Sequence, residues 1–247
     1  MKILLAPSET KVVGGETPFQ PEELFFKALH PLQQQIVTRY QNTLLNASDE
    51  ALSQMLGIKK LDNIPHYRNA IVHAPTVKAI ERYSGVAFDY MGYSRLDTHA
   101  QTYIDNHVIL FSNLFGILKA NDLIPEYKLK QGEPIGDIKT NKLYKASVTQ
   151  ILDAYLSDED ILDIRAGYYD KFYTPDKPYT TLKFVKNGKV VSHWAKAYRG
   201  KVLSEIAKHQ INSLEEFMKL EIANLRIDEI QTIKNKTQII YNIIGET

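Results

Sequence analysis

Three short segments of the sequence place polar and charged residues directly after an apolar run. The first, residues 7–11, reads Pro-Ser-Glu-Thr-Lys and follows the apolar residues 3–6. In α/β sheets, ligands often bind beyond the carboxyl ends of strands, so a hydroxyl, a carboxylate and an amine at this point form a candidate site. We therefore interpret Ser8 and Lys11 as binding residues and Glu9 as a candidate general acid or base. A solvated turn is the alternative interpretation.

The second segment, residues 163–169, reads Asp-Ile-Arg-Ala-Gly-Tyr-Tyr and also follows a short apolar run. Alternate side chains of a strand point to the same face, so we expect Asp163 and Arg165 on one side. Asp163 is then a second candidate general acid or base, Arg165 a candidate anion-binding residue, and Tyr169 a ring that could stack on a base. A structural Asp–Arg ion pair is the alternative.

The third segment, residues 192–201, reads Ser-His-Trp-Ala-Lys-Ala-Tyr-Arg-Gly-Lys. Lys196, Arg199 and Lys201 crowd the end of a predicted hairpin and the start of a predicted helix. Main-chain N–H groups at a helix start, together with nearby cations, suit a phosphate group. A basic, solvated face is the alternative.

The composition removes several kinds of chemistry. The chain has no cysteine, which excludes disulfides, thiolate nucleophiles and Cys-based zinc or iron–sulfur sites. The seven histidines are scattered and form no His-x-x-x-His pair, so we predict no metal site. Glycine-rich nucleotide-binding motifs are absent, and we predict no cofactor. The net charge is only +1, so a role with nucleic acid requires positive charge segregated onto one face.

Hydrophobic periodicity predicts a mixed α/β fold, with a mixed sheet flanked by helices, in a single domain over residues 1–247. The predicted strands are residues 3–6, 107–111, 160–165, 225–230 and 237–243. The predicted helices are residues 22–46, 49–56, 141–156 and 199–210, and one more that opens at the capping box 213–216. Asn187-Gly188, between residues 181–184 and 190–194, predicts a β-hairpin.

The N-terminal apolar run is too short for a signal peptide or a membrane span. It comprises only residues 3–6, whereas a spanning helix needs about 20 apolar residues. We therefore expect a cytoplasmic protein with no membrane partner, and we favour a monomer.

The same segments resemble motifs of the YaaA family of bacterial peroxide stress proteins. Residues 7–11 are similar to the opening motif of one branch, Pro-Ser-Glu-Thr-Lys, whereas the enteric branch opens Ser-Pro-Ala-Lys-Thr. Residues 114–132 resemble the most specific signature of the family, which runs Leu, aromatic, Gly, a Leu-Arg/Lys pair, Asp, then Tyr-Arg/Lys-Leu and Gly. Residues 163–169 and 192–200 resemble two later blocks, and residues 82–88 resemble a weaker one.

The resemblance implies a function and a structural element. The family acts in the bacterial cytoplasm in the response to hydrogen peroxide, where it limits damage by keeping free iron low. The resemblance also implies DNA binding through a positively charged cleft and a helix-hairpin-helix element. We place that element within residues 49–69, where Gly57 precedes Lys59 and Lys60, because main-chain amides at such a hairpin can hold a phosphate without reading bases. An ordinary helix–turn–helix packing element is the alternative.

Two functions follow from these observations. The first is a stress protein that binds DNA or another nucleic acid in a basic cleft without turnover. The second is an enzyme that acts on a nucleotide or nucleobase in the same cleft, with Glu9 or Asp163 as general acid or base. In both cases, the three segments should converge in space. The candidate residues for nucleic-acid or anion binding are Ser8, Lys11, Lys128, Arg165, Tyr169, Lys196, Arg199 and Lys201.

Overall fold

Parallel strands build the middle of the large sheet, and β1 (Lys2–Leu5) lies between two of them. The computed structural model describes residues 1–245, apart from the side chains at positions 192 and 193. β1 pairs in parallel with β4 (Val108–Ser112) on one side and with β7 (Ile161–Asp163) on the other. The sheet has the order β10-β11-β8-β7-β1-β4-β5, and β9 pairs with β8. The carboxyl ends of β7, β1 and β4 therefore meet at one edge.

Antiparallel pairs close both ends of the large sheet, and a small sheet lies beside it. The other strands of the large sheet are β5 (Gly116–Lys119), β8 (Tyr179–Lys186), β9 (Lys189–Val190), β10 (Leu225–Ile233) and β11 (Lys236–Ile243). β8 runs parallel to β7 and β11, whereas β10 is antiparallel to β11 and β5 to β4. The small antiparallel sheet comprises β2 (Thr17–Pro18), β3 (Pro75–Lys78) and β6 (Leu123–Pro125).

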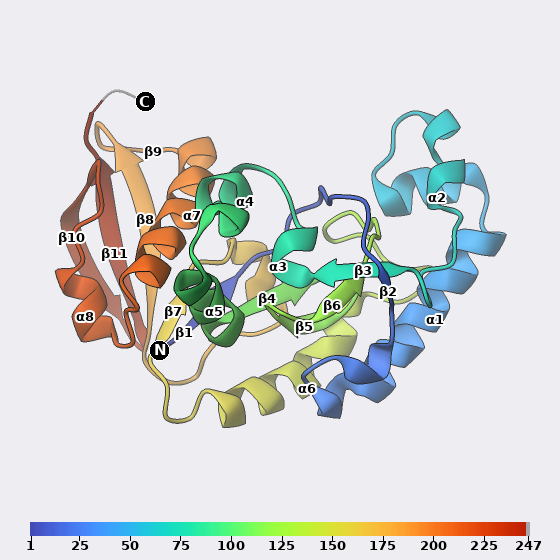
Figure 1. The fold of residues 1–247 in the computed structure, drawn as a ribbon, viewed down its shortest axis with the longest axis horizontal. Helices are drawn as coiled ribbons and strands as arrows, with labels where there is room; N and C mark the ends of the chain where they lie inside the picture. The colour runs from blue at the N-terminus through green and yellow to red at the C-terminus, as the bar shows by residue number, and fades with distance from the viewer. Residues whose placement is uncertain (246–247) are drawn as a thin grey trace.

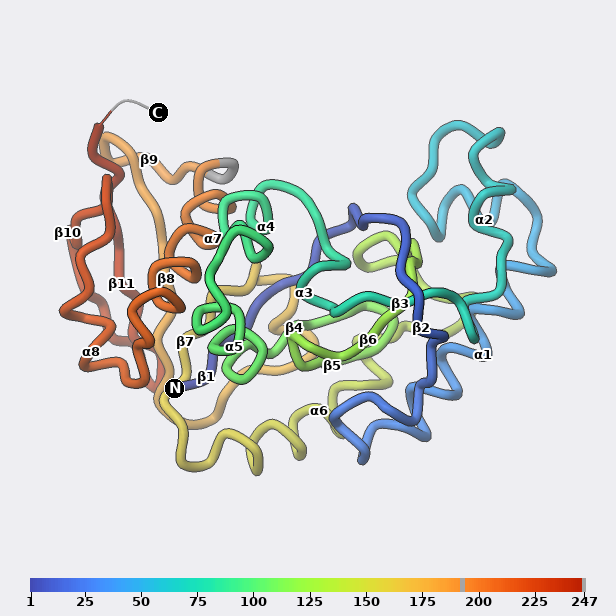
Figure 2. The backbone as a smooth tube through the Cα atoms, in the orientation of Figure 1, coloured from blue at the N-terminus to red at the C-terminus, as the bar shows by residue number. Residues whose placement is uncertain are grey.

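Helices surround the two sheets. The α-helices are α1 (His30–Asn46), α2 (Asp49–Leu56), α3 (Ala79–Arg82), α4 (Val86–Met91), α5 (Thr98–His107), α6 (Thr140–Tyr155), α7 (Ser192–Lys208) and α8 (Leu214–Lys219). In Figure 1, α4, α5 and α7 lie together in front of the large sheet, and α1 and α2 lie at the end where the small sheet is. The chain after β1 crosses from the large sheet to β2, as the blue trace in Figure 2 shows. That crossing segment carries the first polar motif.

Most of the buried apolar side chains form one cluster, which includes residues from Met1 to Ile243. β4 buries all of its residues, as expected for a strand covered on both faces. The predicted mixed α/β fold is confirmed, and the expected strands occur as β1, β4, β7, β10 and β11. In residues 1–245, none of the helices has the length and apolar character needed to cross a membrane.

The first long helix begins later than predicted. α1 begins at His30 rather than at residue 22, and residues 21–29 contain the 3-10 helices η1 (Pro21–Glu23) and η2 (Lys27–Leu29) instead. Pro31 lies in the first turn of α1, where its missing N–H leaves no hydrogen bond unmade. A helix that began at residue 22 would have placed this proline in its interior.

The predicted hairpin forms, but its second strand is short. Asn187 and Gly188 both have positive φ angles, 51° and 72°, as the tight turn between β8 and β9 requires. β9 covers only Lys189–Val190, and α7 begins at Ser192 rather than at residue 199. Lys196, Arg199 and Lys201, which we expected at the end of a hairpin and the start of a helix, therefore all lie within α7. Apolar residues at helical spacing explain the difference, since Ala195, Tyr198 and Val202 are all buried.

Replacing Gly200 should separate two helices that pack closely. A Cβ atom at position 200 of α7 would lie 1.9 Å from the carbonyl oxygen of Ala87 in α4, so the backbone itself would have to shift. We expect Gly200→Ala to lower the free energy of unfolding by about 1–3 kcal/mol, even though alanine favours a helix interior by about 1 kcal/mol. Urea denaturation measures the effect.

Gly167→Ala is the matched control. A Cβ atom at Gly167 would approach only the carboxylate of Asp170, at 3.9 Å. This variant should leave the free energy of unfolding unchanged or slightly raised, since alanine restricts the unfolded chain. Equal losses in the two variants would contradict the close helix contact at Gly200.

Candidate functional site

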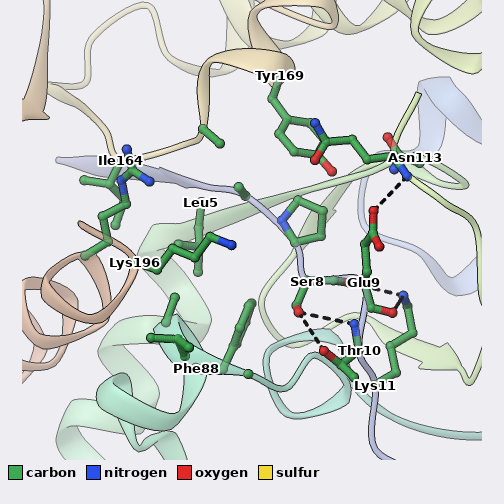
Figure 3. A pocket seen from close by; sticks show the side chains of 18 of the residues that line it. Leu5, Ser8, Glu9, Thr10, Lys11, Phe88, Asn113, Ile164, Tyr169 and Lys196 are labelled. Atoms are coloured by element: carbon green, nitrogen blue, oxygen red, sulfur yellow. Dashed lines mark hydrogen bonds between the residues drawn. The ribbon is translucent and has the colours of Figure 1, made fainter. Parts of the chain in front are cut away.

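A cavity of about 550 Å³ lies at the carboxyl ends of β7, β1 and β4 (Figure 3). Ligands bind at this edge in many parallel sheets. Apolar side chains such as Phe88, Leu129 and Ile164 form part of its wall. The polar residues that line it are Ser8, Glu9, Thr10, Lys11, Asn113, Gln131, Lys196 and Arg199. The first and third polar segments of the sequence therefore converge on one cavity.

The chain after β1 turns at the cavity wall and is held there by its own side chains. The Ser8 hydroxyl accepts a hydrogen bond from the N–H of Thr10 at 3.3 Å. The Glu9 carboxylate accepts one from the N–H of Gln131 at 3.1 Å. Figure 3 shows Ser8, Glu9 and Thr10 on the same side of the cavity. Glu9 thus links the loop after β1 to a segment more than a hundred residues away in the sequence.

Lys11 is partly buried in the wall of the cavity. Its Nζ donates to the main-chain carbonyls of Ser8 at 3.2 Å and Glu9 at 3.4 Å, and it lies 4.1 Å from the ring centroid of Tyr127. Burial, and then the neighbouring positive charge of Lys128, lowers the pKa of Lys11 to about 7. A substantial fraction of this amine is therefore neutral near pH 7.

A chain of hydroxyl groups fixes the rings beside Lys11. The Tyr83 and Tyr127 hydroxyls are 2.7 Å apart, and Tyr127 lies 2.8 Å from the Ser112 hydroxyl at the end of β4. Burial raises the pKa of Tyr83 to about 12 and that of Tyr127 well above its ordinary value. Both phenols are consequently neutral and offer the lysine no opposite charge.

Arg82 holds the loop that carries the lysine. Its side chain is fully buried, and its guanidinium donates to the carbonyls of Val12 at 2.6 Å and Gly14 at 2.9 Å. The same group donates to the carbonyls of Pro75 in β3, at 3.1 Å, and Ile124 in β6, at 3.2 Å. The loop after β1 is thereby fixed to the small sheet.

Asp163 and Arg165 lie outside the cavity lining. Nε of Arg165 donates to Oδ1 of Asp163 at 2.9 Å and Nη2 donates to Oδ2 at 2.6 Å, while the other N–H groups reach the carbonyls of Tyr169 and Tyr173. The Arg165 side chain is 1% exposed, and its guanidinium lies 4.2 Å from the ring centroid of Phe111. The geometry is that of a structural ion pair. The pair fixes the turn that presents Tyr169, which does line the cavity.

Two of the three cations of the third segment line the cavity. Lys196 and Arg199 are three residues apart in α7 and lie on one face of the helix, whereas Lys201 is rotated away from them. Lys201 lies outside the lining and donates to the carbonyl of Ala223 at 2.8 Å. The helix predicted from the sequence began only at residue 199, so the sequence did not show that Lys201 faces away from Lys196 and Arg199.

The Arg199 guanidinium is unusual among the described residues. Its Nε is buried and has no hydrogen-bond partner in the described part of the chain. Burial lowers the pKa of Arg199 from its ordinary value, and the charge of Asp163 opposes this change. Arg199 as a whole is half-buried, and a guanidinium whose Nε lacks an acceptor is available to an anion in the cavity.

A family model described as peroxide stress protein YaaA matches residues 1–231. This chain belongs to the YaaA family of peroxide stress proteins. It is 44% identical over 245 residues to the uncharacterized protein Cj0984 of Campylobacter jejuni. The aligned region covers 99% of this chain and 100% of that protein. This chain is 34% identical over 216 residues to the UPF0246 protein CE1889 of Corynebacterium efficiens, with 84% and 85% of the two chains covered. The resemblance inferred from the motifs is confirmed.

In this member of the YaaA family, Lys128 lines a second cavity of about 500 Å³. The two cavities are neighbours, since Tyr127 and Leu129 line the first and Lys128, between them, lines the second. The Tyr40 hydroxyl donates to the carbonyl of Lys128 at 2.7 Å and accepts from its N–H at 3.2 Å. Tyr40 thereby fixes the backbone that separates the two cavities.

The helix-hairpin-helix element expected within residues 49–69 is not seen. α2 ends at Gly57, which has a φ angle of 67°, but the 3-10 helices η3 (Leu61–Asn63) and η4 (Pro65–Tyr67) follow instead of a second α-helix. A proline fits in the first turn of a helix but not in its interior. Pro65 therefore prevents a long second helix from starting soon after the turn at Gly57 and continuing through position 65. Lys59 and Lys60 do line the second cavity with Lys128.

Several residues of the site were missed in the sequence. Asn113 is 6% exposed, lines the cavity and has a buried Oδ1 with no hydrogen-bond partner in the described part of the chain. It directly follows β4, so the same rule that pointed to the segment after β1 would have found it. Gly85 and Phe88 also line the wall. They belong to residues 82–88, which place no charged side chain at the cavity, so nothing in their residue types indicated a binding site.

Lys11 should make the stability of the protein depend on pH near neutrality. Its pKa is about 7 in the folded chain and 10.5 is its ordinary value, so between these values the unfolded state binds more protons. The free energy of unfolding should therefore rise as the pH increases from about 7 to about 9. Lys11→Met should show a smaller rise in urea denaturation.

Lys145→Met removes an exposed lysine on α6 and should retain the full rise. If Lys11→Met and the unmodified protein showed equal slopes, the lowered pKa of Lys11 would be refuted.

Proposed function

We propose that the cavity binds one nucleotide unit of a nucleic acid, with its phosphate held by Arg199 and Lys196. The observation that carries this proposal is the buried Nε of Arg199, which has no hydrogen-bond partner among the described residues and belongs to a side chain that lines the cavity. A guanidinium matches a phosphate because its planar N–H groups can donate two parallel hydrogen bonds. The exposed ammonium of Lys196, one turn earlier, adds a second positive charge.

The remaining wall suits a sugar or a base. Phe88, Leu129, Ile164 and Tyr169 offer apolar surface, and the unpartnered Oδ1 of Asn113 offers an acceptor. Ligand sites typically combine an apolar wall with a few polar groups that fix the orientation. A volume of about 550 Å³ is in the range of such sites.

The second cavity favours a polymer over a single nucleotide. Lys59, Lys60 and Lys128 line it, and Lys128 lies in the chain between Tyr127 and Leu129, which line the first cavity. Both cavities therefore have lysine or arginine side chains in their linings, in a protein whose net charge is only +1. Segregated cations of this kind suit successive phosphates of a strand.

The proposal also accounts for the role in peroxide stress. We propose that the protein limits iron-dependent oxidative damage at the nucleic acid itself. Direct storage of iron has little support, because the described residues contain no group of three or more His, Cys, Asp or Glu side chains that could hold a metal ion.

An enzyme that acts on a nucleotide in the same cavity is the second candidate. The specific observation in its favour is Lys11, whose pKa of about 7 lies near the pH at which a catalytic amine is most useful. Binding and catalysis would use the same cavity residues. Both functions therefore require the affinity for a nucleic acid that the following experiment measures.

Removing the two cations of α7 should weaken binding to a fluorescent single-stranded oligonucleotide. Each lost phosphate contact should reduce the slope of log affinity against log salt by about 0.7, the value per phosphate for single strands. Lys196→Ala and Arg199→Ala should each show this change, and affinity should be nearly indifferent to sequence because the contacts are to phosphates. Fluorescence anisotropy at several salt concentrations gives the slopes.

Lys201→Ala is the matched control, because it removes a cation from the same helix on a face outside the cavity. Its salt slope should equal that of the unmodified protein. Equal slopes in all the variants would overturn the proposed phosphate site.

A further inference from the structure

We infer that Lys11 is a nucleophile that forms an imine with an aldehyde carried on a nucleotide unit, namely the ring-opened C1′ aldehyde of a deoxyribose that has lost its base. This inference rests on the proposed nucleotide-binding function of the cavity and names its substrate class. Its geometric basis is that Lys11 lines the cavity and that its Nζ lies beside two tyrosine rings, unpaired with any carboxylate of the described residues.

Lys78 has the opposite environment to that of Lys11. Nζ of Lys78 lies 2.6 Å from the carboxylate of Asp105 and 3.0 Å from the Tyr93 hydroxyl. Although burial disfavours its charge, these hydrogen bonds raise the pKa of Lys78. Among the described residues, the hydrogen-bond acceptors of Lys11 are two main-chain carbonyls, at 3.2 and 3.4 Å. Burial without a carboxylate partner leaves a neutral, nucleophilic amine.

The surroundings of Lys11 also favour reaction over ion pairing. Tyr83 and Tyr127 are neutral phenols whose hydroxyls are bonded to each other at 2.7 Å. They give the amine a rigid, weakly polar neighbour and restrict its access to water. Arg82 fixes the next residues of the loop through the carbonyls of Val12 and Gly14, so the backbone of the nucleophile is held in place.

The cavity can present a suitable carbonyl group. Lys11 lies on the loop after β1, whereas Arg199 and Lys196 lie on α7, and all three line the same cavity. A sugar phosphate that places its phosphate at α7 therefore extends toward other parts of the wall. A deoxyribose without its base exposes an aldehyde in its ring-opened form and still carries its phosphate, so it satisfies both requirements.

The reaction is balanced without an oxidant or a reductant. The lone pair of Nζ attacks the aldehyde carbon, and the C–N bond forms while the carbonyl oxygen takes up a proton. The resulting carbinolamine loses this oxygen as water, and a proton leaves the nitrogen. The products are the imine and one water molecule. Asn113 and Glu9 line the same cavity and could orient the departing hydroxyl.

The test traps the imine with sodium cyanoborohydride, which reduces it to a stable amine, and identifies the modified residue by peptide mass spectrometry. Two probes are used with the full chain: an oligonucleotide with one abasic site, and 2-deoxyribose 5-phosphate, which carries the aldehyde and the phosphate without a polymer. We expect an adduct on Lys11 with one or both probes. Lys11→Met should lose this adduct, and Lys145→Met, which lacks only an exposed lysine of α6, should keep it.

A parallel anisotropy measurement with the intact oligonucleotide separates this inference from the proposed function. Binding of the oligonucleotide without an adduct on Lys11 from either probe would overturn the imine and leave nucleic-acid binding intact. If the protein formed an adduct with 2-deoxyribose 5-phosphate but did not bind the oligonucleotide, Lys11 would be supported as a nucleophile. The proposal that the cavity binds a nucleic-acid strand would then be refuted. Adducts spread over exposed lysines, with none enriched at Lys11, would also overturn the inference.

Discussion

The cavity depends on one buried guanidinium. Arg82 has no exposed surface, and it donates hydrogen bonds to four main-chain carbonyls, those of Val12, Gly14, Pro75 and Ile124. These carbonyls belong to the loop after β1 and to the small sheet, so one side chain connects the polar motif to β3 and β6. Losing it would leave several buried carbonyls without a donor, each costing about 1–3 kcal/mol. The position of Lys11 follows from this constraint.

Two kinds of cation with restricted access to water lie near the cavity, one paired with a carboxylate and one without such a partner. Arg165 is neutralised by Asp163 and serves the turn that presents Tyr169. Lys11 and Arg199 are withdrawn from water without such a partner, and burial lowers the pKa of each. Unpaired buried cations destabilise a protein unless a ligand compensates them. An anion in the cavity would provide that compensation, which links the stability of the site to its occupancy.

Much of this arrangement could be predicted from the sequence because β1, β4 and β7 are short apolar runs followed at once by polar residues. The roles of Arg165 and Lys201 could not be separated from those of Lys196 and Arg199, because all are cations near a strand end or helix start. Only the bidentate geometry to Asp163 and the helical rotation between Arg199 and Lys201 distinguish them. Asn113 was missed although it obeys the same strand-end rule.

A nucleic acid that enters the cavity at the carboxyl ends of β7, β1 and β4 should change the surroundings of the main-chain amides there. Backbone amide NMR spectra, recorded while a short single-stranded oligonucleotide is added, test it most directly. We predict that the largest shifts occur in the loop after β1, at Asn113, near Tyr169 and in the first turns of α7. Shifts confined to residues far from this cavity, or no shifts at saturating oligonucleotide, would contradict it.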